Sequence, residues 1–403
     1  MHPDMLAAAL EGNGIPPGAF GRVVYASSCG SNVLPGATDM TLAIQHAIDT
    51  CPSGGTVSGD GQLYAVSNLF LKSEMTFRDF RLLTIPGTAD DVSPINIGDD
   101  LRPGNAAYSA SQAAPGIVDI VLDGVRIDGN RQNQTNLVAR DGGRHGIKIA
   151  GYCQRIVLRN VRAENCATDG LLVYRGLHAP TSLDSVQHGF DLLLDNCQFN
   201  GNRRHGMAAE SFDRLTIRNS VFNGNGQNVR GGLVEGDLGA LSLGLRYGNG
   251  LDFEGYGLGS RVTNLRLEGV TARGNVRDGI LVMDIVDPSH ENFMARGPIW
   301  LDKCDLDCGT ANVNGEYALT FTSTIANRDK GFVYDKITVR DCNVDGLFMF
   351  RSVARAQIFG GTQTVPTTEA RGALDYATLR TSGLISNRVG FSPFNSTLVE
   401  LTA

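Results

Sequence analysis

A repeated unit in the middle of the chain constrains the fold more than any other feature. Its segments read QRIVLRNVRAENCATDGLLVY, FDLLLDNCQFNGNRRHGMAAES, FDRLTIRNSVFNGNG, VTNLRLEGVTARGNVRDGILVM and YDKITVRDCNVDGLFMF. Most give a short alternating strand, a polar Asn or Asp, a second strand, and then a Gly with a third apolar strand. One such coil cannot bury its own apolar side, whereas stacked coils bury a continuous core. The repeat therefore predicts an all-β solenoid, a single-stranded right-handed parallel β-helix.

The composition agrees with a solenoid and excludes some classes of function. The chain holds 50 Gly but one Trp, and Gly and Asn supply the positive φ angles at coil corners. The net charge of −7, with acids and bases well mixed, argues against a nucleic-acid partner. No apolar run is long enough for a membrane span, and no secretory signal is visible at the N-terminus. A secreted chain and a virion protein both fit, so an extracellular or virion-associated location is favoured.

The order of elements divides the chain into three parts. Residues 1–37 are predicted to be irregular, residues 38–364 to form the β-helix with its cap, and residues 365–403 to form a C-terminal cap or oligomerisation segment. In the sequence ATDMTLAIQHAIDTC, an apolar stripe of Leu42, Ile44, Ala47 and Ile48 predicts a helix near 41–49. A helix there would cover the open end of the first coil. The apolar strands of the last segment favour a homo-oligomer, most simply a trimer.

The N-terminal cap carries a family resemblance. In DMTLAIQHAID followed by GGTVSGDGQLY, the matching residues are Asp39, Ala43, Ile44, Gln45, Ala47, Ile48, Asp49, Gly54, Gly55, Thr56, Val57, Gly61 and Tyr64. This order resembles the cap of pectate-lyase-like and glycoside-hydrolase-28-related β-helix proteins, which include phage tailspike depolymerases. The resemblance implies action on polysaccharides. VRIDGNRQNQT also resembles a segment of mannuronan C5-epimerases, but their Y-G-F-D-P-H run is missing, as are the N-T-D, G-H-G and R-I-K signatures of glycoside hydrolase family 28.

Alignment on the Gly that opens each third strand places every second residue after it on one outward face. These residues are Lys148 and Ala150, Leu172 and Tyr174, Ala208 and Glu210, Asp252 and Glu254, and Leu281 and Met283. Adjacent coils lie about 4.8 Å apart. Tyr174, Glu210 and Glu254 are therefore expected to form a ladder, flanked by Asp252 and Lys148. The intervening residues are almost all apolar and are expected to face the core.

Three carboxylates on two coils repel one another, so at least one is expected to have a raised pKa, the condition for a general acid at neutral pH. Glu210, Asp252 and Glu254 are therefore the predicted catalytic residues, since a second carboxylate can activate water or attack an anomeric carbon. The predicted substrate-binding residues are Tyr174, Lys148, Arg175, His205 and Arg204. No calcium or zinc ligand spacing appears, so no metal and no other cofactor is expected.

Three functions are consistent with these predicted residues. The first is cleavage or transfer of glycosidic bonds in a poly- or oligosaccharide by paired carboxylates. The second is a uronate lyase or C5-epimerase, with Tyr174 or Lys148 taking the C5 proton. The third is a non-catalytic glycan-binding or structural β-helix, in which the acids only keep an exposed strand face soluble. His205, at a coil corner, either hydrogen-bonds within its turn or contacts substrate.

Overall fold

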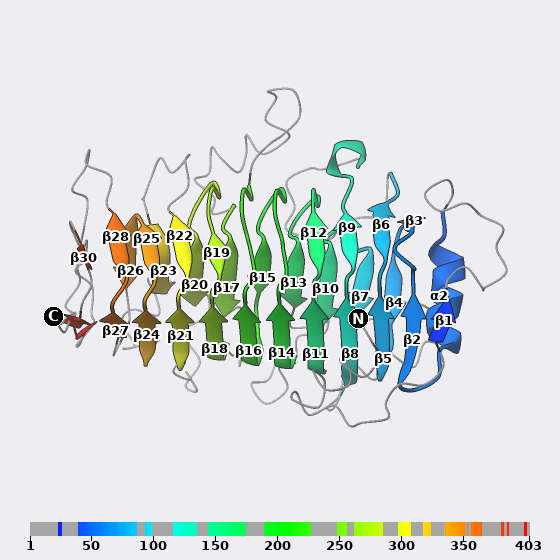
Figure 1. Ribbon diagram of the computed structural model, residues 1–403, viewed down its shortest axis with the longest axis horizontal. Helices are drawn as coiled ribbons and strands as arrows, with labels where there is room; N and C mark the ends of the chain where they lie inside the picture. Colours follow the sequence, from blue (N-terminus) through cyan, green and yellow to red (C-terminus); the bar gives the residue numbers. More distant parts are fainter. Residues whose placement is uncertain are drawn as a thin grey trace.

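The computed structural model describes residues 23–25, 39–86, 93–98, 116–134, 144–174, 189–226, 248–255, 262–284, 297–307, 317–323, 334, 336–350, 353, 356–364, 380–382, 385–386 and 399–400. These residues form a stack of coils with three parallel sheets, here named A, B and C, and the chain winds from the helix at one end to β30 at the other (Figure 1). This confirms the predicted right-handed parallel β-helix. Within the described residues no helix is long and apolar enough to cross a membrane.

Within the described residues, sheet A contains 13 strands. Its strands are, in spatial order, β1 (Val23–Tyr25), β2 (Gly55–Ser58), β5 (Met75–Arg78), β8 (Ile117–Asp123), β11 (Cys153–Arg159), β14 (Gly189–Asp195), β16 (Phe212–Arg218), β18 (Val262–Glu268), β21 (Ile299–Asp302), β24 (Ile337–Arg340), β27 (Ala356–Phe359) and β29 (Arg380–Ser382), with β31 (Val399–Glu400) also paired to β27.

Sheets B and C complete each coil. Sheet B contains β3 (Leu63–Val66), β6 (Arg81–Thr84), β9 (Arg126–Asp128) and β12 (Arg162–Glu164), then β19 (Thr271–Ala272), β22 (Asp305–Asp307), β25 (Asn343–Asp345), β28 (Thr362–Thr364) and β30 (Ile385–Ser386). Single bridges through Gln198 and Val221 join its two halves. Sheet C contains β4 (Leu69–Leu71), β7 (Ile95–Ile97), β10 (Ile147–Ala150), β13 (Leu171–Tyr174), β15 (Met207–Ala209), β17 (Leu251–Gly255), β20 (Ile280–Asp284), β23 (Tyr317–Ser323) and β26 (Leu347–Phe350). The division of the chain at residues 37 and 364 stays a prediction.

The core consists of inward side chains stacked coil upon coil. In sheet C the predicted inward residues are all buried: Ile147, Ile149, Leu171, Val173, Met207, Ala209, Leu251, Phe253, Ile280 and Val282. In sheet A the repeat predicts that Val157, Leu193, Ile217, Leu265 and Ile337 face inward. Ile217, Leu265 and Ile337 do, but the prediction was wrong for Val157 and Leu193, which share the outward row with Thr216 and Arg266. Their neighbours on both sides are also apolar, so alternation could not fix the phase there.

The Asn or Asp between the first and second strands has a specific backbone task. Asp79, Asn160, Asn196, Asn219 and Asp341 adopt positive φ angles between 50° and 56° at the same corner of their coils. Asn and Asp tolerate this left-handed conformation better than other residues with a side chain. The repeated polar residue therefore turns the chain from sheet A into sheet B.

A buried ladder of asparagines holds the corner between sheets B and C. The Asn225 backbone N–H and side-chain amide both donate to Asn275 Oδ1, at 3.0 and 2.9 Å, and those of Asn202 both donate to Asn225 Oδ1, at 3.0 and 3.2 Å. All three side chains are fully buried. Their amides also donate to backbone carbonyls, so the ladder satisfies polar groups that the turns leave inside the coil.

The predicted capping helix is α2 (Thr41–Thr50). Ile44, Ala47 and Ile48 are buried against the first coil, but Leu42 is 86% exposed and does not belong to the predicted apolar stripe. The Gln45 side chain donates to the Phe70 carbonyl at 3.0 Å and accepts from the Phe70 N–H at 2.8 Å. It thus substitutes for a neighbouring strand at the open edge of β4, which would otherwise be free to pair with another chain.

The positions of Cys197, Cys304 and Cys342 at the same point of their repeats predict buried thiols inside the coil. All three are buried, and Cys304 and Cys342 lie on neighbouring coils, where the Cys304 N–H donates to Cys342 Sγ at 3.3 Å. Burial raises the pKa of the Cys197 thiol to about 12, which keeps it protonated and inert. The sequence alone does not decide whether Cys29 and Cys51 form a disulfide, and Cys29 lies outside the described part of the chain.

Candidate functional site

The backbone register of sheet C brings the predicted carboxylates together. Val173 pairs with Ala209 and Ala209 with Phe253, so the next residues along each strand, Tyr174, Glu210 and Glu254, form one outward row. The Glu210 N–H donates to the Val173 carbonyl at 2.9 Å and continues the ladder past the end of β15. Asp252 lies two residues before Glu254 on the same strand and in the same outward phase. Glu210, Asp252 and Glu254 are called the carboxylate site below.

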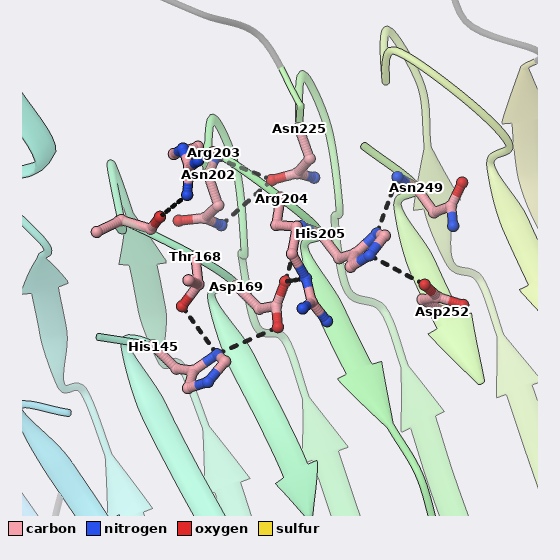
Figure 2. A network of polar contacts seen from close by, with 11 residues as sticks. His145, Thr168, Asp169, Asn202, Arg203, Arg204, His205, Asn225, Asn249 and Asp252 are labelled. Atoms are coloured by element: carbon pink, nitrogen blue, oxygen red, sulfur yellow. Dashed lines mark hydrogen bonds and ion pairs between the residues drawn. The ribbon is translucent and has the colours of Figure 1, made fainter. Parts of the chain in front are cut away.

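Asp252 is held by a buried histidine. His205 Nε2 lies 3.0 Å from Asp252 Oδ2, and both residues are about 1% exposed (Figure 2). His205 Nδ1 accepts the Asn249 backbone N–H at 3.1 Å, which fixes the proton of the neutral imidazole on Nε2. His205 therefore donates to Asp252 and sets the position of that carboxylate. Asp252 Oδ1 is also buried but has no hydrogen-bond partner among the described residues.

A second buried acid supports this pair from the coil before it. Asp169 Oδ1 accepts from the His205 backbone N–H at 2.9 Å and from Arg204 Nε at 3.0 Å. Asp169 Oδ2 lies 3.1 Å from His145 Nδ1, and the Thr168 hydroxyl lies 3.0 Å from the same nitrogen (Figure 2). These contacts connect coil corners on three neighbouring turns of the β-helix.

The protonation of this network follows from its charges. Burial alone would raise the pKa of Asp169, but Arg204 and the hydrogen bond with His145 outweigh burial and leave that pKa well below its ordinary value. Burial lowers the pKa of His145, opposed by Asp169. Asp169 is thus a permanent negative charge behind the carboxylate site, balanced by Arg204.

The pKa of Glu254 is shifted in the opposite direction to that of Asp169. Burial is the largest cause that raises its pKa to about 8, and the charges of Asp252 and Glu210 raise it further, while Arg204 opposes them. At neutral pH the Glu254 carboxyl therefore carries a proton. A carboxyl group that keeps its proton at neutral pH can act as a general acid.

The predicted substrate-binding residues fall into three groups. Lys148 and Tyr174 are half-buried at the edge of the carboxylate site, and Lys148 Nζ lies 5.3 Å from the centre of the Tyr174 ring. Arg204 is 13% exposed and His205 is enclosed, so both lie behind the carboxylates within the polar network. Arg175 lies outside the described residues.

Sequence reasoning did not assign a role to Asp169, Asn249 or His145 in supporting the site. One signal was available, because His145, Asp169, His205 and Asn249 all precede the Gly that opens a sheet C strand. Corner residues that differ in charge from coil to coil can pair along the stack, and they do so here. Within the described residues no group of three or more His, Cys, Asp or Glu could hold a metal ion.

Comparisons with known proteins show the fold. No family model and no curated protein matches the sequence. Among solved structures, the Streptococcus pneumoniae surface protein and adhesin PfbA is similar, with a TM-score of 0.55 and 14% identity over 94% of this chain and 89% of that one. The Yersinia enterocolitica family 28 exopolygalacturonase is similar with a TM-score of 0.41 and 13% identity, over 94% and 77%. The A-module of the Azotobacter vinelandii mannuronan C-5 epimerase AlgE4 gives 0.41 and 13%, over 94% and 97%.

Proposed function

We propose that the protein is a carbohydrate-active enzyme that cleaves or transfers glycosidic bonds of a poly- or oligosaccharide at the carboxylate site. The observation that carries this proposal is the protonated Glu254 beside two further carboxyl groups on an outward row of sheet C. Glycoside chemistry needs one carboxylic acid that donates a proton and a second that acts as base or nucleophile. Glu254 suits the first role, and Glu210 on the neighbouring coil is placed for the second.

In this mechanism Glu254 donates its proton to the leaving glycosidic oxygen. Glu210, on the neighbouring coil, either activates water or attacks the anomeric carbon. Asp252 is fixed by His205 and enclosed, so it acts through its charge, which helps to keep the proton on Glu254. His205 and Arg204 are therefore positioning residues, while Lys148 and Tyr174 border the substrate.

The alternative of a uronate lyase or C5-epimerase has one observation in its favour. Lys148 Nζ lies 5.3 Å from the centre of the Tyr174 ring on the next coil, so the two side chains that could take a C5 proton lie side by side. A non-catalytic role has the adhesin PfbA as a structural neighbour. Action on long glycans fits a location outside the cell or on a virion. We also propose a homo-oligomer, most simply a trimer, which light scattering at micromolar concentration would test.

A panel of neutral and acidic polysaccharides tests the function. New reducing ends without absorbance from an unsaturated C4–C5 bond support hydrolysis, and an alkaline limb of the rate near pH 8 would report the Glu254 proton. The unsaturated product would support the lyase instead, and binding without any product would support the non-catalytic role. Glu268→Gln, an exchange of an ion-paired glutamate on sheet A, serves as a control that should keep full activity.

A further inference from the structure

A second charged surface lies on sheet B, away from the carboxylate site. Arg81, Arg126 and Arg162 pair in register on β6, β9 and β12, so three like charges stack on successive coils. All three side chains are exposed, and none makes an ion pair or a side-chain hydrogen bond with any described residue. Like charges directly opposite each other in a sheet are destabilising, so this arrangement is not explained by stability.

These arginines line a groove of about 660 Å³ at the corner between sheets A and B. The groove, called the arginine groove below, also contains Asn160, Asn196 and Gln198. Asn196 Nδ2 donates to Asn160 Oδ1 at 2.8 Å, and Asn160 Nδ2 donates to Asp123 Oδ1 at 2.8 Å. The carboxamides are thus fixed in a row that runs parallel to the arginines along the stack of coils.

Two carboxylates at one end of the groove restrict its ligand. Asp60 accepts from the Ser58 hydroxyl at 3.1 Å, and Asp79 lies 3.5 Å from Arg78 Nε. The groove therefore combines three guanidinium groups with carboxamides and two acids. Carboxylates accept hydrogen bonds from sugar hydroxyls, so the two acids add acceptors for a glycan. Guanidinium groups, in turn, recognise carboxylates with paired hydrogen bonds.

We propose that the arginine groove binds an extended acidic polysaccharide, with carboxylates of its uronic acid residues on Arg126 and Arg162 and its hydroxyls on the carboxamides and acids. The coil spacing of about 4.8 Å sets the arginines at regular intervals, which suits a chain with regularly repeated acidic groups. The groove shares no residue with the carboxylate site. The proposal therefore stands or fails separately from the proposed catalytic function.

Affinity measurements on the full chain test this proposal, with polygalacturonate, neutral dextran and dextran sulfate as probes. The double variant Arg126→Gln, Arg162→Gln should bind polygalacturonate at least about tenfold more weakly, because each charge-assisted hydrogen bond contributes at least that much. The control Arg266→Gln, Arg340→Gln removes the same charge from arginines that pair with Glu268 and Asp302 on sheet A. It should change affinity less than twofold, and neutral dextran should not bind.

The Glu254→Gln variant distinguishes binding in the groove from catalysis. It should lose turnover but bind polygalacturonate in the groove as tightly as the wild type. Three outcomes would overturn the proposal: absence of polygalacturonate binding, unchanged affinity in the groove variant, or equal weakening by the groove and control variants. The last outcome, together with tight binding of dextran sulfate, would indicate general electrostatic attraction instead of a glycan groove.

Discussion

The charged side chains of sheets B and C differ in burial and in pairing. On sheet C, His145, Asp169, His205 and Asp252 are enclosed and joined by hydrogen bonds from one coil corner to the next. On sheet B, the three arginines of the groove are exposed and have no partner among the described residues. Buried charges interact strongly and hold a fixed geometry, whereas exposed charges are screened and remain available to a ligand. The β-helix thus separates an enclosed, hydrogen-bonded network of charges from an exposed row of like charges.

Among the substitutions that test this difference between the two sheets, the removal of Asp169 should have the largest effect. Asp169→Ala leaves Arg204 and His145 without their buried partner, so the free energy of unfolding should fall by about 3–5 kcal/mol. Chemical denaturation followed by circular dichroism measures the change. Asp195→Ala, which removes a partly exposed partner of Arg218, should cost only about 0–1 kcal/mol. Equal losses in the two variants would show that the sheet C network is not specially stabilising.

The second effect concerns turnover. Glu254→Gln keeps the size and hydrogen-bonding capacity of the side chain but removes its transferable proton, so turnover of the polysaccharide found active should fall by about 100-fold or more. The thermal midpoint should not fall below that of the wild type, so a lower rate would not reflect unfolding. A Glu254→Gln protein with an unchanged rate would place the proton donor elsewhere and leave the sheet C carboxyl groups as a solvated face.

The outward row of this site could be predicted from sequence because strand alternation and the repeat Gly fix both phase and register. Tyr174, Glu210 and Glu254 lie at equal distances from their repeat Gly residues, and the pairing of β13, β15 and β17 follows that alignment. Where three apolar residues follow one another, as around Val157, the same rule failed. Alternation predicts which residues face inward only where polar residues separate the apolar ones.

The support behind the site could not be predicted in the same way. Whether His205 faces the solvent or Asp252 depends on the course of the corner backbone, and alternation says nothing about corners. The arginine groove is a similar case. Arg81, Arg126 and Arg162 stand at irregular intervals in the sequence, and only the strand register shows that they stack.

A third effect is the dependence of stability on pH. The pKa of Glu254 is about 8 in the folded protein and close to 4.5 when it is unfolded. Between these values the folded state holds more protons than the unfolded state, so stability should fall as pH rises from about 4.5 to 8. The contribution of Glu254 is at most about 1.4 kcal/mol per pH unit. Thermal midpoints of wild type and Glu254→Gln across this range should converge at low pH and separate at high pH in favour of the variant.

The smallest expected effect is a gain in stability, in contrast to the loss expected for Asp169→Ala. Arg126 stands between Arg81 and Arg162, so Arg126→Gln removes two unfavourable like-charge contacts at an exposed position. The free energy of unfolding should therefore rise by a few tenths of a kcal/mol, an effect that high salt reduces because the charges are exposed. Thermal melts at low and high ionic strength measure both the gain and its loss. If Arg126→Gln instead destabilises the protein, then Arg126 has a stabilising role in the fold, and its exposure is no longer evidence that it is kept for a ligand.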